Sequence, residues 1–385
     1  MNRLSWFLTN TNKRTPTPFG NIYSKTSWSD LSDFTNNTTS VSVVANQLQF
    51  TGGAGDQLKH IEYNYVSALE NFTMTALVQF GTRSTTSYGM GLCITSQGYG
   101  FKYSIGSQIT NHSADPGHMY LGAANTPYPN TVPGTVNVVS GISFSATDVM
   151  EVIMQRAYNV FTLKLRNVTT SSAQVTLTYT FPLGPSPANV MPNAFRYGIS
   201  NYGGTWTLVG LTIATTVNKY NDYCFVGDSK TTGYAATAEA NTFSSIIRNT
   251  YPNLHRIAGG GCTTSDILLC VPEIIMLQPK KVIICGLGRN DISLAVPSGT
   301  WQANYSSIVS QLLSAGKIVR HGLPFVESGG LGGQSVLQNW QNATFSASDI
   351  IANTMTTGQV SSDLVHPADS GMATIANDYL TSGKL

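Results

Sequence analysis

The hydrophobic pattern of this 385-residue chain changes its period near residue 216. Upstream, from about residue 20 to 215, short segments alternate apolar and polar residues, and no helical period is convincing. Strict alternation predicts antiparallel strands that bury one face. Turn-forming residues separate these segments, so we expect an all-β sandwich. The clearest candidate strands lie at 40–44, 47–50, 72–80, 149–154 and 161–165.

Downstream of residue 216, apolar strand-like runs alternate with stretches of helical period. This alternation predicts a parallel sheet covered by helices on both faces. Strands are expected at 223–227, 254–258, 281–286 and 317–326, and helices at 235–249, 264–277, 301–315, 334–342 and 370–381. The chain exceeds the usual length of one domain. We therefore expect an N-terminal extension at 1–19, a β-sandwich at 20–215, a linker at 216–222 and an α/β domain at 223–385.

A candidate nucleophile follows the first strand of the second half. Residues 223–229 read Tyr-Cys-Phe-Val-Gly-Asp-Ser, which places Ser229 at the carboxyl end of that strand. In an open α/β sheet this edge is where ligands bind. A Gly-Asp-Ser tripeptide alone is more often an ordinary turn in a chain rich in glycine and serine. The interpretation of Ser229 therefore depends on its partners.

A candidate base lies near the end of the sequence. Asp363 and His366 are three residues apart, and Pro367 and the last predicted helix follow them. A serine hydroxyl needs a base within hydrogen-bond reach, and a third group must hold that base in one tautomer. One short loop could supply both groups. Taken alone, His366 would be read as a capping or surface histidine.

Two segments could supply donors for the negative charge that develops on a substrate oxygen during acyl transfer. Gly261 ends a run of three glycines, where a backbone N–H can approach a ligand closely. Gly259 and Gly260 remain alternatives to it. The side-chain amide of Asn290 follows the predicted strand 281–286. A plain turn for the glycines and a helix cap for Asn290 are the competing interpretations.

These residues resemble the four blocks of the SGNH hydrolases, also called GDSL esterases, in the order of that family and over roughly residues 220 to 385. The resemblance implies a three-layer, flavodoxin-like α/β fold and a serine esterase that works through an acyl-enzyme. It implies Ser229 as nucleophile, His366 as general base and Asp363 as its orienting partner. The oxyanion donors would be the backbone N–H groups of Ser229 and Gly261 and the amide of Asn290. The chain departs from the family pattern at Lys230, where leucine is usual.

The first half resembles the concanavalin-like jelly-roll modules that are often attached to enzymes acting on glycans. It contains no Glu-x-Asp-x-x-Glu arrangement between residues 20 and 215, the pattern of the glycosidases in that superfamily. We therefore interpret it as a carbohydrate-binding or spacing module. Exposed aromatic rings would form its binding surface, and the candidates are Tyr88, Tyr99, Tyr120, Tyr128, Tyr202 and Trp206.

Charge and composition limit the partners. The net charge is +2, only 10% of the residues are charged, and no long run of Lys or Arg occurs, so a nucleic-acid partner is not expected. No stretch is long enough to span a membrane. Few charges and many Ser, Thr and Asn suit an extracellular or surface-associated protein, although residues 4–8 are too short an apolar run for a secretory signal. Export would then use a removed signal or another route, such as a viral tail.

Metal and disulfide chemistry are not expected to carry the function. His112, Asp115 and His118 could bind a metal, but the intervening Pro-Gly favours a plain surface loop. The five cysteines cannot all pair. A bridge between Cys262 and Cys270 is conceivable but cannot be read from the sequence. The reaction implied above needs no metal or organic cofactor.

The resulting hypothesis is a carboxylic ester hydrolase that removes small acyl groups, acetyl above all, from a polysaccharide or glycoconjugate. A lipase or thioesterase of the same fold is one alternative. A carbohydrate-binding adhesin with a silent hydrolase domain is another. The sequence does not identify the sugar, the acylated hydroxyl or the oligomeric state.

Overall fold

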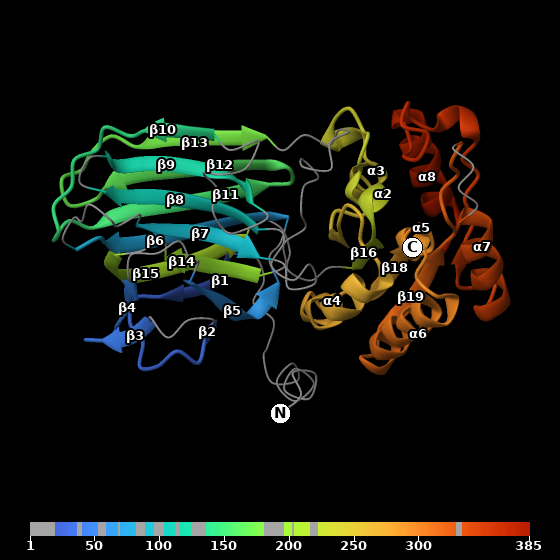
Figure 1. Cartoon of the computed structure of the whole chain (residues 1–385), viewed down its shortest axis with the longest axis horizontal. Coiled ribbons are helices and arrows are strands. Elements are labelled where there is room, and N and C mark those ends of the chain that lie inside the picture. The colour runs from blue at the N-terminus through green and yellow to red at the C-terminus, as the bar shows by residue number, and fades with distance from the viewer. Residues whose placement is uncertain are drawn as a thin grey trace. The chain divides into compact units, whose positions relative to one another are not determined.

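The computed structural model describes residues 20–36, 41–52, 59–67, 70–81, 89–95, 104–112, 115–124, 136–180, 196–201, 204–215, 222–328 and 333–385. Within these ranges the chain forms two compact units, one lying between residues 20 and 215 and the other between 222 and 385 (Figure 1). Each unit has its own buried core.

The first unit is a sandwich of two antiparallel sheets. Within the described ranges, eight strands form one sheet in the order β13 (Val175–Thr180), β12 (Val160–Asn167), β11 (Met150–Ala157), β6 (Asn71–Gln79), β15 (Gly204–Thr215), β4 (Gln47–Gly52) and β3 (Val41–Val44), with β1 (Gly20–Lys25) paired to β15. Seven form the other in the order β10 (Val136–Val139), β9 (Asp115–Ala124), β8 (Ser104–His112), β7 (Met90–Thr95), β14 (Arg196–Asn201), β5 (Lys59–Ser67) and β2 (Phe34–Asn36).

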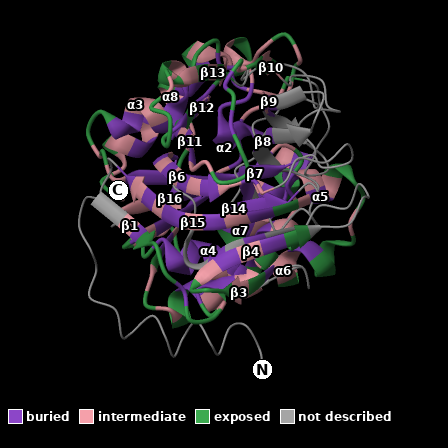
Figure 2. Ribbon diagram, turned by 90° about the vertical axis from the view of Figure 1, so that its left-hand side faces the viewer, coloured by how far each residue is buried: buried purple, intermediate pink, exposed green. Residues whose placement is uncertain are grey.

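Burial alternates along the strands as the sequence pattern predicts. In β6 and β11, every second residue is buried and the residues between are half-buried, apart from the exposed Ala157 at the end of β11 (Figure 2). Successive side chains of a strand point to opposite faces, so each sheet directs one apolar face toward the other sheet. The predicted all-β sandwich of jelly-roll type is confirmed.

Two expectations for the sandwich are wrong. Trp206 is not an exposed ring: it is 1% exposed, stacks on Phe50 at 3.9 Å and donates its indole N–H to Asn201. Its position on β15 turns it into the core. The segment with His112 and Asp115 is not a plain loop, because these two residues pair across the β8–β9 hairpin. Among the other aromatic candidates, Tyr120 is half-buried on β9, and Tyr88, Tyr99, Tyr128 and Tyr202 lie outside the described residues.

The second unit is built on a parallel sheet. Within the described part of the chain its strands lie in the order β17 (Leu254–Ala258), β16 (Tyr223–Gly227), β18 (Lys281–Cys285), β19 (Ile318–Gly322) and β20 (Ile350–Ile351). In sequence order this is 2-1-3-4-5, the flavodoxin-like arrangement, so the predicted fold class is confirmed. The helices are α2 (Ser229–Thr232), η4 (Glu239–Asn241), α3 (Phe243–Arg248), α4 (Thr264–Met276), α5 (Arg289–Ser293), α6 (Ser298–Ser314), α7 (Gly333–Thr344), η5 (Thr357–Gln359) and α8 (Asp369–Thr381).

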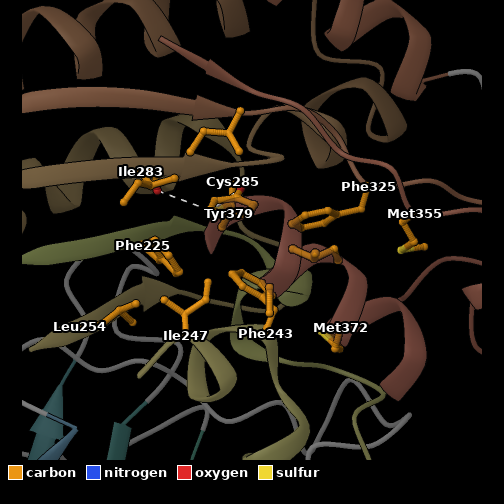
Figure 3. Close-up of a cluster of buried hydrophobic side chains, with 13 residues drawn as sticks. Phe225, Phe243, Ile247, Leu254, Ile283, Cys285, Phe325, Met355, Met372 and Tyr379 are labelled. Carbon is orange, nitrogen blue, oxygen red and sulfur yellow. Dashed lines mark hydrogen bonds between the residues drawn. The ribbon is translucent and has the colours of Figure 1, made fainter. Parts of the chain in front are cut away.

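Helices cover both faces of this sheet. On one face, α3 and α8 pack against alternate residues of β16 and β18, among them Phe225 and Ile283 (Figure 3). The hydroxyl of Tyr379 donates to the Cys285 thiol within this cluster. Helices α4 and α6 contact each other and, respectively, β16 and β19. Both faces of the strands are therefore buried, which explains their continuous apolar runs.

The predicted helix at 235–249 is wrong in its first part, and only α3 within it is α-helical. The helical residues instead begin at Ser229, stop at Thr232, and resume at Phe243 after the short η4. Gly233 adopts a left-handed conformation with φ of 88° and closes α2, and Ala235 also has a positive φ. The side chain of Thr242 then caps α3 by accepting from the Ser245 amide. These stop and start signals override the apolar period.

The conceivable Cys262–Cys270 bridge is also absent, since all five cysteines of the chain are free thiols. Within the described ranges, every helix is too short or too polar to cross a bilayer.

Candidate active site

Ser229 lies at the carboxyl end of strand β16, as the first residue of α2. The turn between them is tight. A side chain at Gly227 would meet the Thr231 hydroxyl and the Cys285 carbonyl, so only glycine lets α2 approach β18 this closely. The buried Asp228 caps the helix by accepting from the Lys230 amide at 3.0 Å.

The candidate base and its carboxylate share one hydrogen-bonded loop before α8. One oxygen of Asp363 accepts from the Ser361 hydroxyl at 2.7 Å and from the amides of Val365 and His366 at 2.9 Å each. Burial alone would raise the pKa of Asp363, but these hydrogen bonds outweigh it and bring the pKa to about 2. The carboxylate is therefore charged at neutral pH.

A continuous hydrogen-bonded chain joins Ser229, His366 and Asp363. The second oxygen of Asp363 lies 2.7 Å from His366 Nδ1, and His366 Nε2 lies 2.8 Å from Ser229 Oγ. Because a carboxylate only accepts, Nδ1 carries the proton and the lone pair of Nε2 faces the serine hydroxyl. This geometry can remove the Ser229 proton during nucleophilic attack.

The imidazole of His366 is packed as well as hydrogen-bonded. The ring of Tyr234 lies 4.1 Å from it, centroid to centroid. Burial lowers the pKa of His366 below its ordinary value, and the charge of Asp363 offsets this only in part. The imidazole is therefore neutral, and able to act as a base, at neutral pH.

Gly261 lies in the turn after β17, which pairs with β16 in register. The turn is closed by the Cys262 amide, which donates to the Gly259 carbonyl at 3.2 Å. Gly261 has a φ of +73°, and the space beside its Cα is open. Of the three glycines, Gly261 is the exposed one and has a left-handed backbone, whereas Gly260 is half-buried and Gly259 is buried.

Asn290 is the second residue of α5, after β18 on the other side of β16. Its amide nitrogen donates one hydrogen to the Cys262 carbonyl at 2.8 Å, which ties it to the residue after Gly261. An amide nitrogen has two hydrogens, so a second remains for a ligand oxygen. The buried Asp291 reinforces this link by accepting from both the amide and the hydroxyl of Thr264, the first residue of α4.

The structure thus brings Ser229, His366 and Asp363 into direct contact and links the Gly261 turn to Asn290. Three of these segments, which hold Ser229, Gly261 and Asn290, follow β16, β17 and β18 at the point where the strand order reverses, which is where open α/β sheets bind ligands. The fourth, the loop of Asp363 and His366, lies before α8. Sequence reasoning missed Tyr234, Arg289 and Glu327. Lys230 signals that some carboxylate lies near, since a lysine that becomes buried needs such a partner, but the sequence does not indicate which one.

In the described part of the chain, no group of three or more His, Cys, Asp or Glu is arranged to hold a metal ion. His118, one of the candidate ligands, is instead engaged by Tyr120 and Asn137 on neighbouring positions of β9 and β10.

Solved structures similar to the protein include two groups. One includes a member of the lipolytic protein G-D-S-L family from Veillonella parvula DSM 2008, 19% identical, with a TM-score of 0.35 over 41% of this chain and 95% of that one. It also includes the psychrotrophic esterase EstA from Pseudoalteromonas sp., 16% identical, with a TM-score of 0.35 over 43% of this chain and 97% of that one.

The second group consists of legume lectins. Winged bean acidic lectin, solved with methyl-α-D-galactose, is 10% identical with a TM-score of 0.38 over 51% of this chain and 98% of the lectin. No protein-family model and no curated protein matches the sequence. These are the two classes that the sequence resembles, and identities this low concern the fold alone.

Proposed function

We propose that the protein is a serine carboxylic ester hydrolase whose active site is formed by Ser229, His366 and Asp363. The observation that carries the proposal is the hydrogen-bonded chain from Asp363 through His366 to the Ser229 hydroxyl, with distances of 2.7 and 2.8 Å. In this order the carboxylate fixes the tautomer, the neutral imidazole accepts a proton, and the serine oxygen becomes nucleophilic.

The reaction would proceed in two halves. Ser229 Oγ attacks the acyl carbonyl carbon while its proton passes to His366 Nε2, and the carbonyl oxygen becomes an oxyanion. The N–H groups of Ser229 and Gly261 and the free amide hydrogen of Asn290 would bind this oxygen. His366 then protonates the departing alcohol oxygen. In the second half, water gives a proton to His366 and attacks the acyl carbon, and the proton returns to Ser229 as the acid leaves.

For the substrate, we infer small acyl groups, acetyl in particular, on a polysaccharide or glycoconjugate. What supports this is the presence, in one chain, of the serine site and of a two-sheet sandwich that resembles the modules attached to glycan-active enzymes. The low charge of the chain suits an uncharged or weakly charged glycan. An extracellular or surface location, where such glycans occur, is part of the same proposal.

The test measures acetate release from a panel of acetylated polysaccharides and from 4-nitrophenyl acetate, with wild type and Ser229→Ala compared. We expect release from one glycan that disappears in the variant, because the nucleophile is lost. Hydrolysis of octanoyl esters in preference to acetyl esters would instead favour a lipase or thioesterase. Glycan binding by both proteins without turnover of any ester would contradict the proposal and favour a binding protein.

A further inference from the structure

Three charged side chains lie buried beside the candidate active site: Lys230, Arg289 and Glu327. Their side chains are only 3%, 9% and 4% exposed. The Lys230 ammonium donates to Glu327 Oε1. The Arg289 guanidinium donates to the same oxygen at 2.7 Å and to Oε2 at 3.0 Å, so one carboxylate gathers both cations. Burial opposes the charged form of Glu327, but the two cations outweigh it and lower its pKa.

Each cation is the direct chain neighbour of a candidate catalytic group. Lys230 follows Ser229 in α2, and Arg289 precedes Asn290 in α5. The two helices begin after different strands, β16 and β18, and the side chain of Glu327 spans them. Glu327 therefore links the helix that begins with Ser229 to the helix that carries the Asn290 amide.

The loop that holds the candidate base His366 is hydrogen-bonded to the residue after Glu327. The amide of Ser328, next to Glu327, donates to the carbonyl of Leu364 at 3.1 Å, and Leu364 lies between Asp363 and His366. The amide of Glu327 itself donates to Oε1 of Gln334, in α7, at 3.3 Å. The Glu327–Ser328 segment is thus hydrogen-bonded to α2, to α5 and to the loop before α8, which are three of the four segments of the candidate active site.

Stability alone does not explain this arrangement. Taking charges out of water is costly, and replacing a buried ionic cluster by apolar side chains of similar volume is often neutral or stabilising. A cluster that serves only packing could therefore be apolar. Geometry gives a better reason, because a displacement of about 1 Å at a reacting centre can lower a rate on the order of 100-fold.

We propose that Glu327 is a positioning residue, which gathers Lys230 and Arg289 so that Ser229, His366 and Asn290 are held at reacting separations. This inference rests on the proposed esterase function, and it concerns the relative placement of those groups rather than their chemistry. Lys230, the departure from the usual leucine of the motif, then has a role through the carboxylate that it binds.

The first test shortens the carboxylate without removing its charge. Glu327→Asp should lower kcat for 4-nitrophenyl acetate by roughly 10- to 100-fold, because the shorter side chain cannot reach both cations. KM should change little. Glu239→Asp is the matched control: Glu239 also gathers two arginines, Arg248 at 3.2 Å and Arg256 at 2.7 Å. That variant should lose stability but keep kcat.

The second test separates positioning from stability. The triple variant Lys230→Met, Arg289→Met and Glu327→Met should keep or raise the melting temperature, as apolar replacements of buried ions often do. Its kcat should nevertheless fall as far as that of Glu327→Asp. A triple variant that folds and keeps wild-type kcat, or a Glu327→Asp protein whose only defect is a lower melting temperature, would overturn the proposal.

A readout independent of ester turnover keeps the two proposals apart. The rate at which a fluorophosphonate labels Ser229, followed by mass spectrometry, requires a positioned serine but no natural substrate. If wild type is labelled at Ser229 yet hydrolyses no ester, the esterase proposal fails, and slower labelling of Glu327→Asp still supports the positioning role. Equal labelling rates, or no labelling of wild-type Ser229, would contradict it.

Discussion

At the scale of single residues, burial and hydrogen bonding assign opposite tasks to His366 and Asp363. The imidazole is desolvated, which lowers its pKa and favours the neutral base, whereas the carboxylate has three donors on one oxygen and stays charged. The pairing lets one loop hold both a proton acceptor and the anion that orients it.

This assignment predicts the acid limb of the pH profile, that is, how activity falls as the pH is lowered. Because burial holds the pKa of His366 below the ordinary value of about 6.5, kcat/KM for a neutral ester should rise with pH with its midpoint below that value. Asp363, with a pKa of about 2, stays ionised across this limb and adds no second step. Acetate release measured between pH 4 and 8 checks this. A limb centred above 6.5 would contradict the assignment.

At the scale of elements, Ser229, the candidate nucleophile, is positioned by a turn that leaves no space for a side chain at Gly227. The chain passes from β16 into α2 within two residues, and the backbone of β18 lies against this turn. Close approach of helix and strand is what brings Ser229 to the sheet edge, and it depends on the absence of a side chain at Gly227.

Gly227→Ala should therefore destabilise the protein by roughly 1–3 kcal/mol, the cost of overpacking a filled site. The new methyl group would lie 2.5 Å from the Cys285 carbonyl oxygen and would also meet the Thr231 hydroxyl. Gly299→Ala, in the exposed first turn of α6 with open space around it, is the control and should stabilise by up to about 0.5 kcal/mol. Urea unfolding measures both. Equal stabilities would show that the turn can relax.

At the scale of the whole molecule, both units carry free thiols in their cores. Cys93 lies in the sandwich and the other four cysteines in the α/β unit, and each is at most 2% exposed. Burial also raises the pKa of the Cys285 thiol to about 12, so this thiol stays protonated at neutral pH. A protonated thiol is a poor nucleophile, because the thiolate is the reactive form. Each unit is therefore stabilised by its own buried core rather than by disulfide bonds.

In the native protein, none of the five thiols should accordingly react with Ellman's reagent within minutes. After unfolding in guanidinium, all five should react. Its melting temperature should be the same with and without a reductant. A native thiol that reacts rapidly would reveal local opening of one core, and a reductant-dependent melting temperature would contradict the absence of disulfides.

Much of the fold was determined by local pattern. The change of period near residue 216 predicts a sandwich and a parallel α/β unit, and strands such as 223–227 and 254–258 have the predicted bounds. Alternation and continuous apolar runs carry this information because they follow directly from which faces of a strand are buried. The motifs also named Ser229, Asp363 and His366, which the structure joins by hydrogen bonds, although their catalytic roles stay predictions.

Only the tertiary structure decided which distant groups meet. It buried Trp206, divided the predicted helix at 235–249, formed no disulfide between Cys262 and Cys270, and joined Lys230 to a carboxylate 97 residues away. None of these follows from a period or a motif. A buried charge such as that of Lys230 is tolerated only where an oppositely charged partner lies beside it. Here that partner belongs to a distant segment, and its position depends on how whole strands and helices pack.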